Sequence, residues 1–173
     1  ARLLVPGWYG MANVKWLVSV EAVAEPFRGH HQVVAYVLRD HPDDEGEPVR
    51  RMQPRAVMIP PGIPGFPERT RTLDRGSTAL EGRAWSGEAP VASVEVSTDG
   101  GASWAEAELV RDVDSPWAWC AWRFLWTPAE AGEVELCCRA RDAAGNTQPL
   151  EPVENVGGYV NNGVQRVRVT VRG

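Results

Sequence analysis

Paired histidines and alternating aspartates are the residues of this chain that could bind a metal ion. His30 and His31 carry nitrogen donors for transition metals, but neighbours on an extended segment point apart and no third ligand follows at matched spacing. Asp112 and Asp114 lack the glycine and the closing glutamate of a calcium loop. We therefore interpret both pairs as loop or strand-edge residues, and we predict no metal site.

The three cysteines could form a disulfide, bind zinc or act as nucleophiles. They are Cys120, Cys137 and Cys138, an odd number without the Cys-x-x-Cys spacing of a zinc site. Neighbouring residues of a strand point to opposite faces, so the adjacent pair is unsuited to a disulfide. We interpret all three as small buried or half-buried thiols.

Arginines flank a proline-rich stretch at residues 52–67. Arg50 and Arg51 precede it, and Arg69 and Arg71 follow it. We interpret them as solvated side chains rather than an anion site. The sequence has no nucleophile elbow, phosphate-binding loop, dinucleotide fingerprint or zinc-protease helix motif, so it predicts no catalytic residue and no complete active site.

Composition narrows the class of protein further. The 173 residues include 18 basic and 23 acidic side chains, a net charge of −5, which disfavours a nucleic-acid partner. The longest apolar stretches are too short or too rich in proline to cross a bilayer, so we predict a soluble protein without a membrane span.

The elements that must position any site are predicted to be strands. The 17 glycines and 14 prolines favour many turns over a helical bundle. Alternating apolar and polar residues predict a β-sandwich with strands at 79–86, 91–97, 104–110, 118–126, 134–140 and 164–171. The strand at 91–97 sorts its valines onto one face only if it contains a bulge.

Aromatic residues occupy both faces of the region around 117–126. Trp122, Phe124 and Trp126 share one face, while Trp117 and Trp119 share the other. Because a sandwich strand needs only one buried face, we expect another domain, a partner subunit or a long loop to cover the second face.

The N-terminal third has a different organisation. We expect a strand at 17–23, a short extended run at 32–38, an acidic surface loop at 40–48 and an extended connector at 52–67. Residues 1–7 show neither an initiator Met nor a signal-peptide pattern, so we expect the chain to begin inside a longer protein.

A family resemblance is carried by residues 5–17, which contain Pro-Gly, a second Gly three residues later, and Val-Lys-Trp-Leu. This segment resembles the end of the molybdopterin-binding domain of the sulfite oxidase family, which includes the molybdenum domain of eukaryotic nitrate reductases. Further segments resemble bacterial members in order and spacing: 25–27, 46–49, 55–62, 82–87, 94–104, 117–119 and 139–149.

The resemblance implies a division of the chain. Residues 1–44 would be the C-terminal remnant of the molybdopterin-binding domain, and residues 45–173 an immunoglobulin-like dimerisation domain. The implied fold class is all-β, an immunoglobulin-like β-sandwich with an extended N-terminal segment. The implied partners are a second copy, forming a homodimer through the sandwich, and a molybdopterin domain upstream that carries the cysteine ligand of molybdenum.

The resemblance also implies site residues. Asn13, Val14 and Lys15 match the segment that contacts the molybdopterin cofactor, and an ammonium group suits an anionic phosphate. Tyr36 has the spacing of an active-site tyrosine, and Arg166 resembles an arginine that holds the oxyanion substrate. Val-Gln replaces the usual Trp-His before that arginine. A surface lysine, a packed tyrosine and a structural arginine are the alternatives.

The implied function is that of the dimerisation part of a sulfite-oxidase-type molybdenum oxidoreductase. The intact enzyme would hold molybdenum and molybdopterin and transfer an oxygen atom to a small oxyanion such as sulfite. We expect this chain alone to lack cofactor and activity, and the enzyme to lie in the bacterial cytoplasm or periplasm. The alternative is a free-standing immunoglobulin-like binding or interaction module.

Overall fold

A computed structural model describes residues 1–66 and 68–173, and it is mostly β, as expected. Its two short helices are a 3-10 helix, η1 (Gly10–Ala12), and a π-helix, η2 (His31–Ala35). Its strands are β1 (Val37–Leu38), β2 (Glu47–Pro48), β3 (Arg55–Ile59), β4 (Ile63–Pro64), β5 (Arg71–Asp74), β6 (Thr78–Trp85), β7 (Val91–Ser97), β8 (Ala105–Glu106), β9 (Glu108–Val110), β10 (Cys120–Trp126), β11 (Gly132–Asp142) and β12 (Gln165–Arg172).

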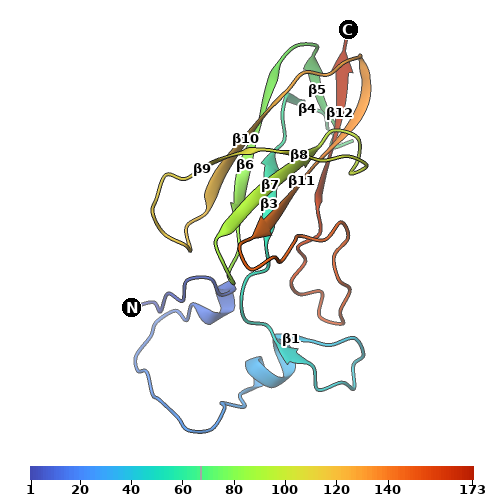
Figure 1. The fold of residues 1–173 in the computed structure, drawn as a ribbon. Helices are drawn as coiled ribbons and strands as arrows, with labels where there is room; N and C mark the ends of the chain where they lie inside the picture. The colour runs from blue at the N-terminus through green and yellow to red at the C-terminus, as the bar shows by residue number, and fades with distance from the viewer. Residues whose placement is uncertain (67) are drawn as a thin grey trace.

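Two sheets face each other and enclose the core (Figure 1). One has the strand order β3-β6-β10-β9 and the other β4-β5-β12-β11-β7-β8, while β1 and β2 form a separate hairpin. Leu80 and Trp122 from the first sheet and Val94, Leu136 and Val169 from the second belong to one buried cluster. The apolar faces of the two sheets therefore cover one another, as in other two-layer β folds.

Strands with one buried face match their predictions well. In β12 the valines at 167, 169 and 171 are buried, and the arginines at 166, 168 and 172 on the opposite face are exposed. In β7 the register passes from Ser93 opposite Arg141 to Val91 opposite Asp142, which leaves Ala92 as an extra residue. This irregularity is the bulge expected in the strand at 91–97, and it allows Val91 and Val94 both to be buried.

The prediction of an extended connector at 52–67 is wrong for the first half of this range, which contains strand β3. Strand β3 pairs antiparallel with β6, and its Ala56 and Met58 are buried in the core. The prolines lie outside β3, so they do not interrupt its hydrogen bonds, and its alternating side chains pack like those of any half-buried strand. Pro67, at the end of the expected connector, lies outside the described residues.

The expected strand at 17–23 is also wrong, because these residues form no strand and Val18 and Val20 are exposed. Alternation is not sufficient for a strand, which needs a neighbour to pair its backbone groups, and no strand of the described chain pairs with this segment. The expected extended run at 32–38 is helical over η2 and extended only at β1.

The expected strand at 104–110 is divided between the sheets. Its first part, β8, pairs with β7, whereas β9 pairs with β10 in the opposite sheet. Ala107 lies between them, is buried, and donates its backbone N–H to the carbonyl of Val94. This segment therefore crosses from one sheet to the other at a single buried residue.

Within β10 the aromatic residues are placed as the alternation predicts. The aromatic residues just before the strand are arranged differently. Trp122 and Trp126 are buried in the core. Trp119, just before the strand, remains exposed and stacks on Trp85 with ring centroids 4.4 Å apart. Trp117 lies 5.5 Å from the Arg51 guanidinium, so part of the second aromatic face is covered by the chain itself.

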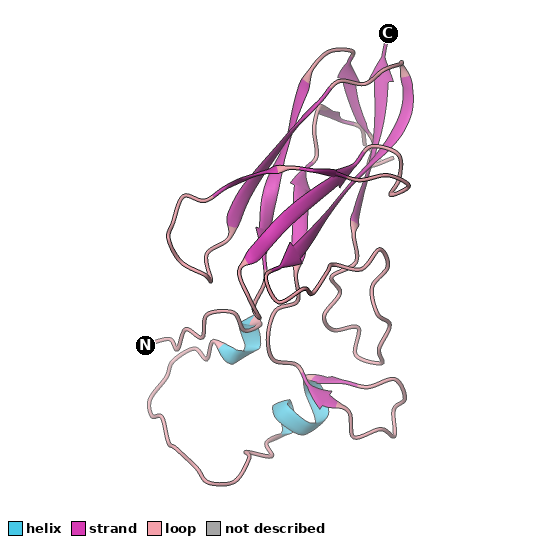
Figure 2. Cartoon of the chain, in the orientation of Figure 1, coloured by secondary structure: helices cyan, strands magenta, loops and turns pink. Residues whose placement is uncertain are grey.

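The N-terminal segment lies at one end of the two sheets, where loops predominate (Figures 1 and 2). Met52 donates its N–H to the Gly7 carbonyl at 2.8 Å, and Gly87 donates to the Met52 carbonyl at 2.7 Å. These bonds join residues 7, 52 and 87 in one backbone junction. Within the described chain, no helix is long and apolar enough to span a membrane.

Candidate functional site

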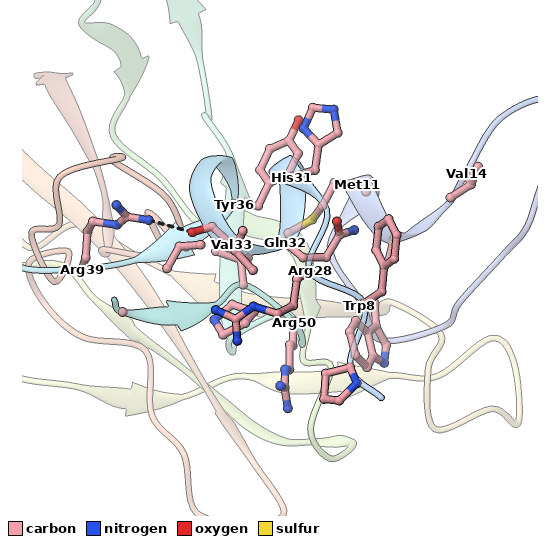
Figure 3. Close-up of a pocket in the computed structure, with 18 of the residues that line it drawn as sticks. Trp8, Met11, Val14, Arg28, His31, Gln32, Val33, Tyr36, Arg39 and Arg50 are labelled. Atoms are coloured by element: carbon pink, nitrogen blue, oxygen red, sulfur yellow. Dashed lines mark hydrogen bonds between the residues drawn. The ribbon is translucent and has the colours of Figure 1, made fainter. Parts of the chain in front are cut away.

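A cavity of about 1150 Å³ lies within the N-terminal third of the chain (Figure 3). Its walls come from residues 8–15, 26–39 and 44–50. The first wall contains η1, the second contains η2 and β1, and the third contains the returning strand β2. The β1–β2 hairpin brings the third wall back beside the second, because Val37 pairs with Pro48 and Leu38 with Glu47.

Cationic side chains outnumber acidic ones in this lining. The cations are Lys15, Arg28, Arg39 and Arg50, and the acids are Asp44 and Glu45. In the view of Figure 3, Arg28 and Arg50 lie together below His31 and Tyr36. The excess of positive charge suits an anionic ligand, for which guanidinium and ammonium groups are the usual donors.

The four cationic side chains differ in the hydrogen bonds and ion pairs that they make within the chain. Arg39 donates to the carbonyls of Val33 and Val34 at 3.3 and 3.2 Å, so it holds η2 rather than a ligand. Arg28 approaches Glu45 at 3.7 Å in an exposed ion pair. Among the described residues, Lys15 and Arg50 make no ion pair within 4.0 Å. Lys15 is the one lysine of the sequence.

Asn13 has a structural task in this site. Its side-chain oxygen accepts the Val5 N–H at 2.8 Å, and its amide donates to the Tyr9 carbonyl at 3.4 Å. The loop is closed further by Leu3, whose N–H bonds the Val14 carbonyl at 3.0 Å. These contacts place Val14 and Lys15 on the cavity wall.

Tyr36 ends η2 and also lines the cavity, as Figure 3 shows. Its ring packs against those of His31 and Tyr159, with centroid distances of 5.6 and 5.5 Å. Tyr159 belongs to the long loop before β12, so this aromatic cluster connects the cavity to that loop. The structure therefore brings four of the five predicted site residues, Asn13, Val14, Lys15 and Tyr36, to one cavity.

Arg166 lies elsewhere, on the outer face of β12. It lines a separate hollow of about 330 Å³ together with Arg69 and Arg71. Its guanidinium donates to Glu135 at 2.8 Å and to Glu151 at 3.0 Å, and these hydrogen bonds raise its pKa. Both carboxylates compete with any oxyanion for this side chain, and its substrate role stays a prediction.

The cysteines take no part in the cavity. All three are free and buried between or beside the sheets, and none is among the residues that line the cavity. Burial raises the pKa of each thiol, to about 12 for Cys138. In the described part of the chain, no three His, Cys, Asp or Glu side chains gather around a possible metal position.

The residues that line the cavity are suited to the phosphate of a molybdopterin cofactor but provide no ligand for its molybdenum. Lys15, Arg28 and Arg50 provide cationic donors suited to its anionic phosphate. The lining provides no thiolate for molybdenum. We missed Arg28 and Arg50 in the sequence because their shared location depends on the β1–β2 hairpin, and Arg50 was interpreted there as a solvated side chain.

Comparisons with known proteins agree with this geometry. Residues 64–172 match the family model of the Mo-co oxidoreductase dimerisation domain, and residues 1–31 match that of the oxidoreductase molybdopterin binding domain. Mitochondrial sulfite oxidase of Rattus norvegicus is 34% identical over 98% of this chain and 33% of its own length. The NADH nitrate reductase of Lotus japonicus is 32% identical over 98% of this chain and 21% of its own length.

A solved structure shows the same fold. The sulfane dehydrogenase SoxCD of Paracoccus pantotrophus matches with a TM-score of 0.81 and 25% identity, over 99% of this chain and 46% of that chain. The chain thus spans about a third of the length of the sulfite oxidases that it matches. These matches favour the dimerisation-domain interpretation over a free-standing binding module, and the chain belongs to the family of Mo-co oxidoreductase dimerisation domains.

Proposed function

We propose that this chain provides the dimerisation domain and one wall of the cofactor cavity in a molybdenum oxidoreductase of the sulfite oxidase type. The observation that carries the proposal is the cation-rich cavity at residues 8–50, which is joined by hydrogen bonds to the two-sheet body. The cavity overlaps the part that matches a molybdopterin-binding family, and the body coincides with the match to the dimerisation family.

In this proposal Lys15, Arg28 and Arg50 bind the anionic phosphate of molybdopterin by charge-assisted hydrogen bonds. Asn13 holds the loop that presents Lys15, and Tyr36 forms the opposite wall near the substrate. When bound, the cofactor would supply oxygen-atom transfer. The names of the relatives, among them sulfite oxidases, support a small oxyanion such as sulfite as the substrate.

The architecture and the assembly belong to the same proposal. We propose that the two-sheet body is an immunoglobulin-like sandwich, that the domain boundary lies between residues 44 and 45, and that the sandwich forms a homodimer. The facing sheets with antiparallel β6-β10 and β7-β11 pairs support the sandwich. The boundary falls within the loop between β1 and β2. The family description supports the homodimer.

The cofactor role is tested in the enzyme expressed from its own gene, with Lys15→Ala. One charge-assisted hydrogen bond contributes about 1.5–3 kcal/mol, so we expect cofactor affinity to fall about tenfold or more. The measurements are molybdenum by elemental analysis and pterin by fluorescence after oxidation, each per mole of protein. The control is Arg168→Ala, which removes an exposed cation from β12. An unchanged pterin content after Lys15→Ala would show that the lysine does not bind the cofactor.

A further inference from the structure

The loop between β11 and β12 reaches from the sheets to the cavity. It covers residues 143–164, and within it Val156 donates its backbone N–H to the Arg39 carbonyl at 2.9 Å. In Figure 1 this loop extends from the end of the sheets toward β1. Tyr159 of the loop packs against Tyr36, with ring centroids 5.5 Å apart and ring planes at 56°. A residue within the match to the dimerisation family thus contacts a residue that lines the cavity.

Hydrogen bonds to Asn155 fix the backbone of Tyr159. The Asn155 side-chain oxygen accepts the Tyr159 N–H at 3.0 Å, and the Asn155 amide donates to the Tyr159 carbonyl at 2.8 Å. The intervening turn is closed by Gly158, whose N–H donates to the Asn155 carbonyl at 3.0 Å. Both backbone groups of Tyr159 are therefore engaged within the loop, and its ring projects from a closed turn.

The Tyr159 ring also packs on Gly157. A methyl group added to Gly157 would lie 2.5 and 2.6 Å from two carbons of this ring, Cε2 and Cδ2. Such distances are too short for van der Waals contact, so any side chain at residue 157 requires the ring to move. The half-buried Tyr159 ring therefore has two supports, its own loop and the ring of Tyr36.

Tyr36 is held by its backbone and by its ring. Its N–H donates to the His31 carbonyl at 3.0 Å, and its own carbonyl accepts the Val49 N–H at 2.9 Å. Its ring packs against His31 as well as against Tyr159. Among the described residues, none is hydrogen-bonded to the Tyr36 hydroxyl, which leaves this donor available to a ligand in the cavity. Contacts between rings restrict their rotation, so they direct the hydroxyl before a ligand binds.

We propose that Tyr159 is a positioning residue, which directs the Tyr36 hydroxyl toward an oxyanion substrate in the cavity. This inference rests on the proposed function, in which Tyr36 lies near the substrate. An aromatic contact of this kind favours one orientation about two- to tenfold. A donor that is already held in place binds an anion more tightly than one that must be ordered on binding. The loop before β12 thereby contributes to substrate affinity through Tyr36.

A double-mutant cycle tests the proposal in the enzyme expressed from its own gene, with sulfite as the substrate. Tyr159→Leu should raise KM about two- to tenfold and change kcat less, whereas Tyr159→Phe, which keeps the ring, should retain the parent KM. In the Tyr36→Phe background, which lacks the hydroxyl, Tyr159→Leu should raise KM no further. A further rise there would show that Tyr159 acts on the cavity by another route and would overturn the proposal. The control is Val153→Ala, at an exposed residue of the same loop, which should leave KM unchanged.

Fluorine NMR of the chain labelled with 3-fluorotyrosine gives a second test that needs no substrate. The sequence has three tyrosines, Tyr9, Tyr36 and Tyr159, so three single substitutions by phenylalanine assign the three lines. Gly157→Ala should displace the Tyr159 ring and shift the lines of Tyr36 and Tyr159. The Tyr9 line should stay in place, which checks that the rest of the fold is intact. An unshifted Tyr36 line would overturn the proposal, even if Tyr159→Leu failed to fold.

The outcomes separate this inference from the proposed function. If Tyr36→Phe raises KM for sulfite but Tyr159→Leu and Gly157→Ala do not, the positioning role is wrong and the proposed function stands. If Tyr36→Phe leaves KM unchanged, the substrate role of Tyr36 and the positioning role of Tyr159 are both wrong. If the enzyme does not oxidise sulfite, the proposed substrate is wrong, and the fluorine lines alone decide whether Tyr159 orients Tyr36.

Discussion

One buried amide, that of Gln148, joins three segments of the fold. Its side-chain oxygen accepts the N–H of Ala56 at 2.7 Å and that of Ala140 at 3.2 Å. Its side-chain nitrogen donates to the Gly163 carbonyl at 3.2 Å. Gln148 thus completes the hydrogen bonding of strand β3, strand β11 and the loop before β12. Nothing in the sequence around it indicates this role, because its partners are distant in the chain.

We predict that Gln148→Leu lowers the free energy of unfolding by about 2–4 kcal/mol, since it leaves buried backbone groups without partners. Urea denaturation measures the change. Gln53→Leu, at an exposed position, is the matched control and should stay within about 0.5 kcal/mol of the parent. An effect of Gln148→Leu no larger than that of the control would contradict the assigned role.

The three thiols should be unreactive in the folded chain. Burial raises the pKa of Cys120, Cys137 and Cys138, so each stays protonated, and the thiolate is the reactive form. We predict that a disulfide reagent such as Ellman's reagent titrates no thiol in native buffer and three in denaturant. Rapid labelling of a native thiol would contradict the described burial.

The same burial predicts a dependence of stability on pH. Cys138 has a folded pKa of about 12 against 9.0 for an unperturbed thiol, so above pH 9.0 the unfolded chain binds fewer protons than the folded chain. The stability attributable to Cys138 is present in full below pH 9.0 and is lost as pH rises toward 12. Cys138→Ala should reduce this alkaline loss, which urea titrations at several pH values measure.

At the scale of elements, the sequence predicts strands well where burial is one-sided. Strands β7 and β12 show clear alternation because each has one face on the core and one in water. Strand β3 was missed because the prolines around it dominate its composition. Its outer edge is hydrogen-bonded by side chains: Gln148 accepts the N–H of Ala56, and Gln165 accepts that of Met58 at 2.7 Å.

The junction between the N-terminal segment and the sheets depends on glycine. A methyl group at Gly87 would collide with the Gly7 carbonyl oxygen and would lie 2.6 Å from the Met52 nitrogen. We predict that Gly87→Ala loosens this junction and accelerates hydrogen exchange at the amides of Tyr9 and Met52. Gly10→Ala is the matched control, because a methyl group there meets nothing within 4 Å. Equal exchange in both variants would refute the account of the junction.

At the scale of the molecule, the sequence indicates several residues of the candidate site but not the β1–β2 hairpin that completes the cavity. Lys15 and Tyr36 were identified by resemblance and line one cavity with Arg28 and Arg50. The two arginines reach the cavity through the β1–β2 hairpin, which local composition does not reveal. Arg166, to which the resemblance assigns substrate binding, lies outside this cavity on the outer face of β12 in the six-stranded sheet, and its substrate role stays a prediction.

The central claim is that this chain is a dimerisation domain that also carries part of a cofactor wall. Sedimentation equilibrium of residues 1–173 tests it most directly, since the monomer mass is 19.0 kDa. The account predicts a species of twice that mass, which dissociates on dilution. A single species of 19.0 kDa at every concentration would contradict it.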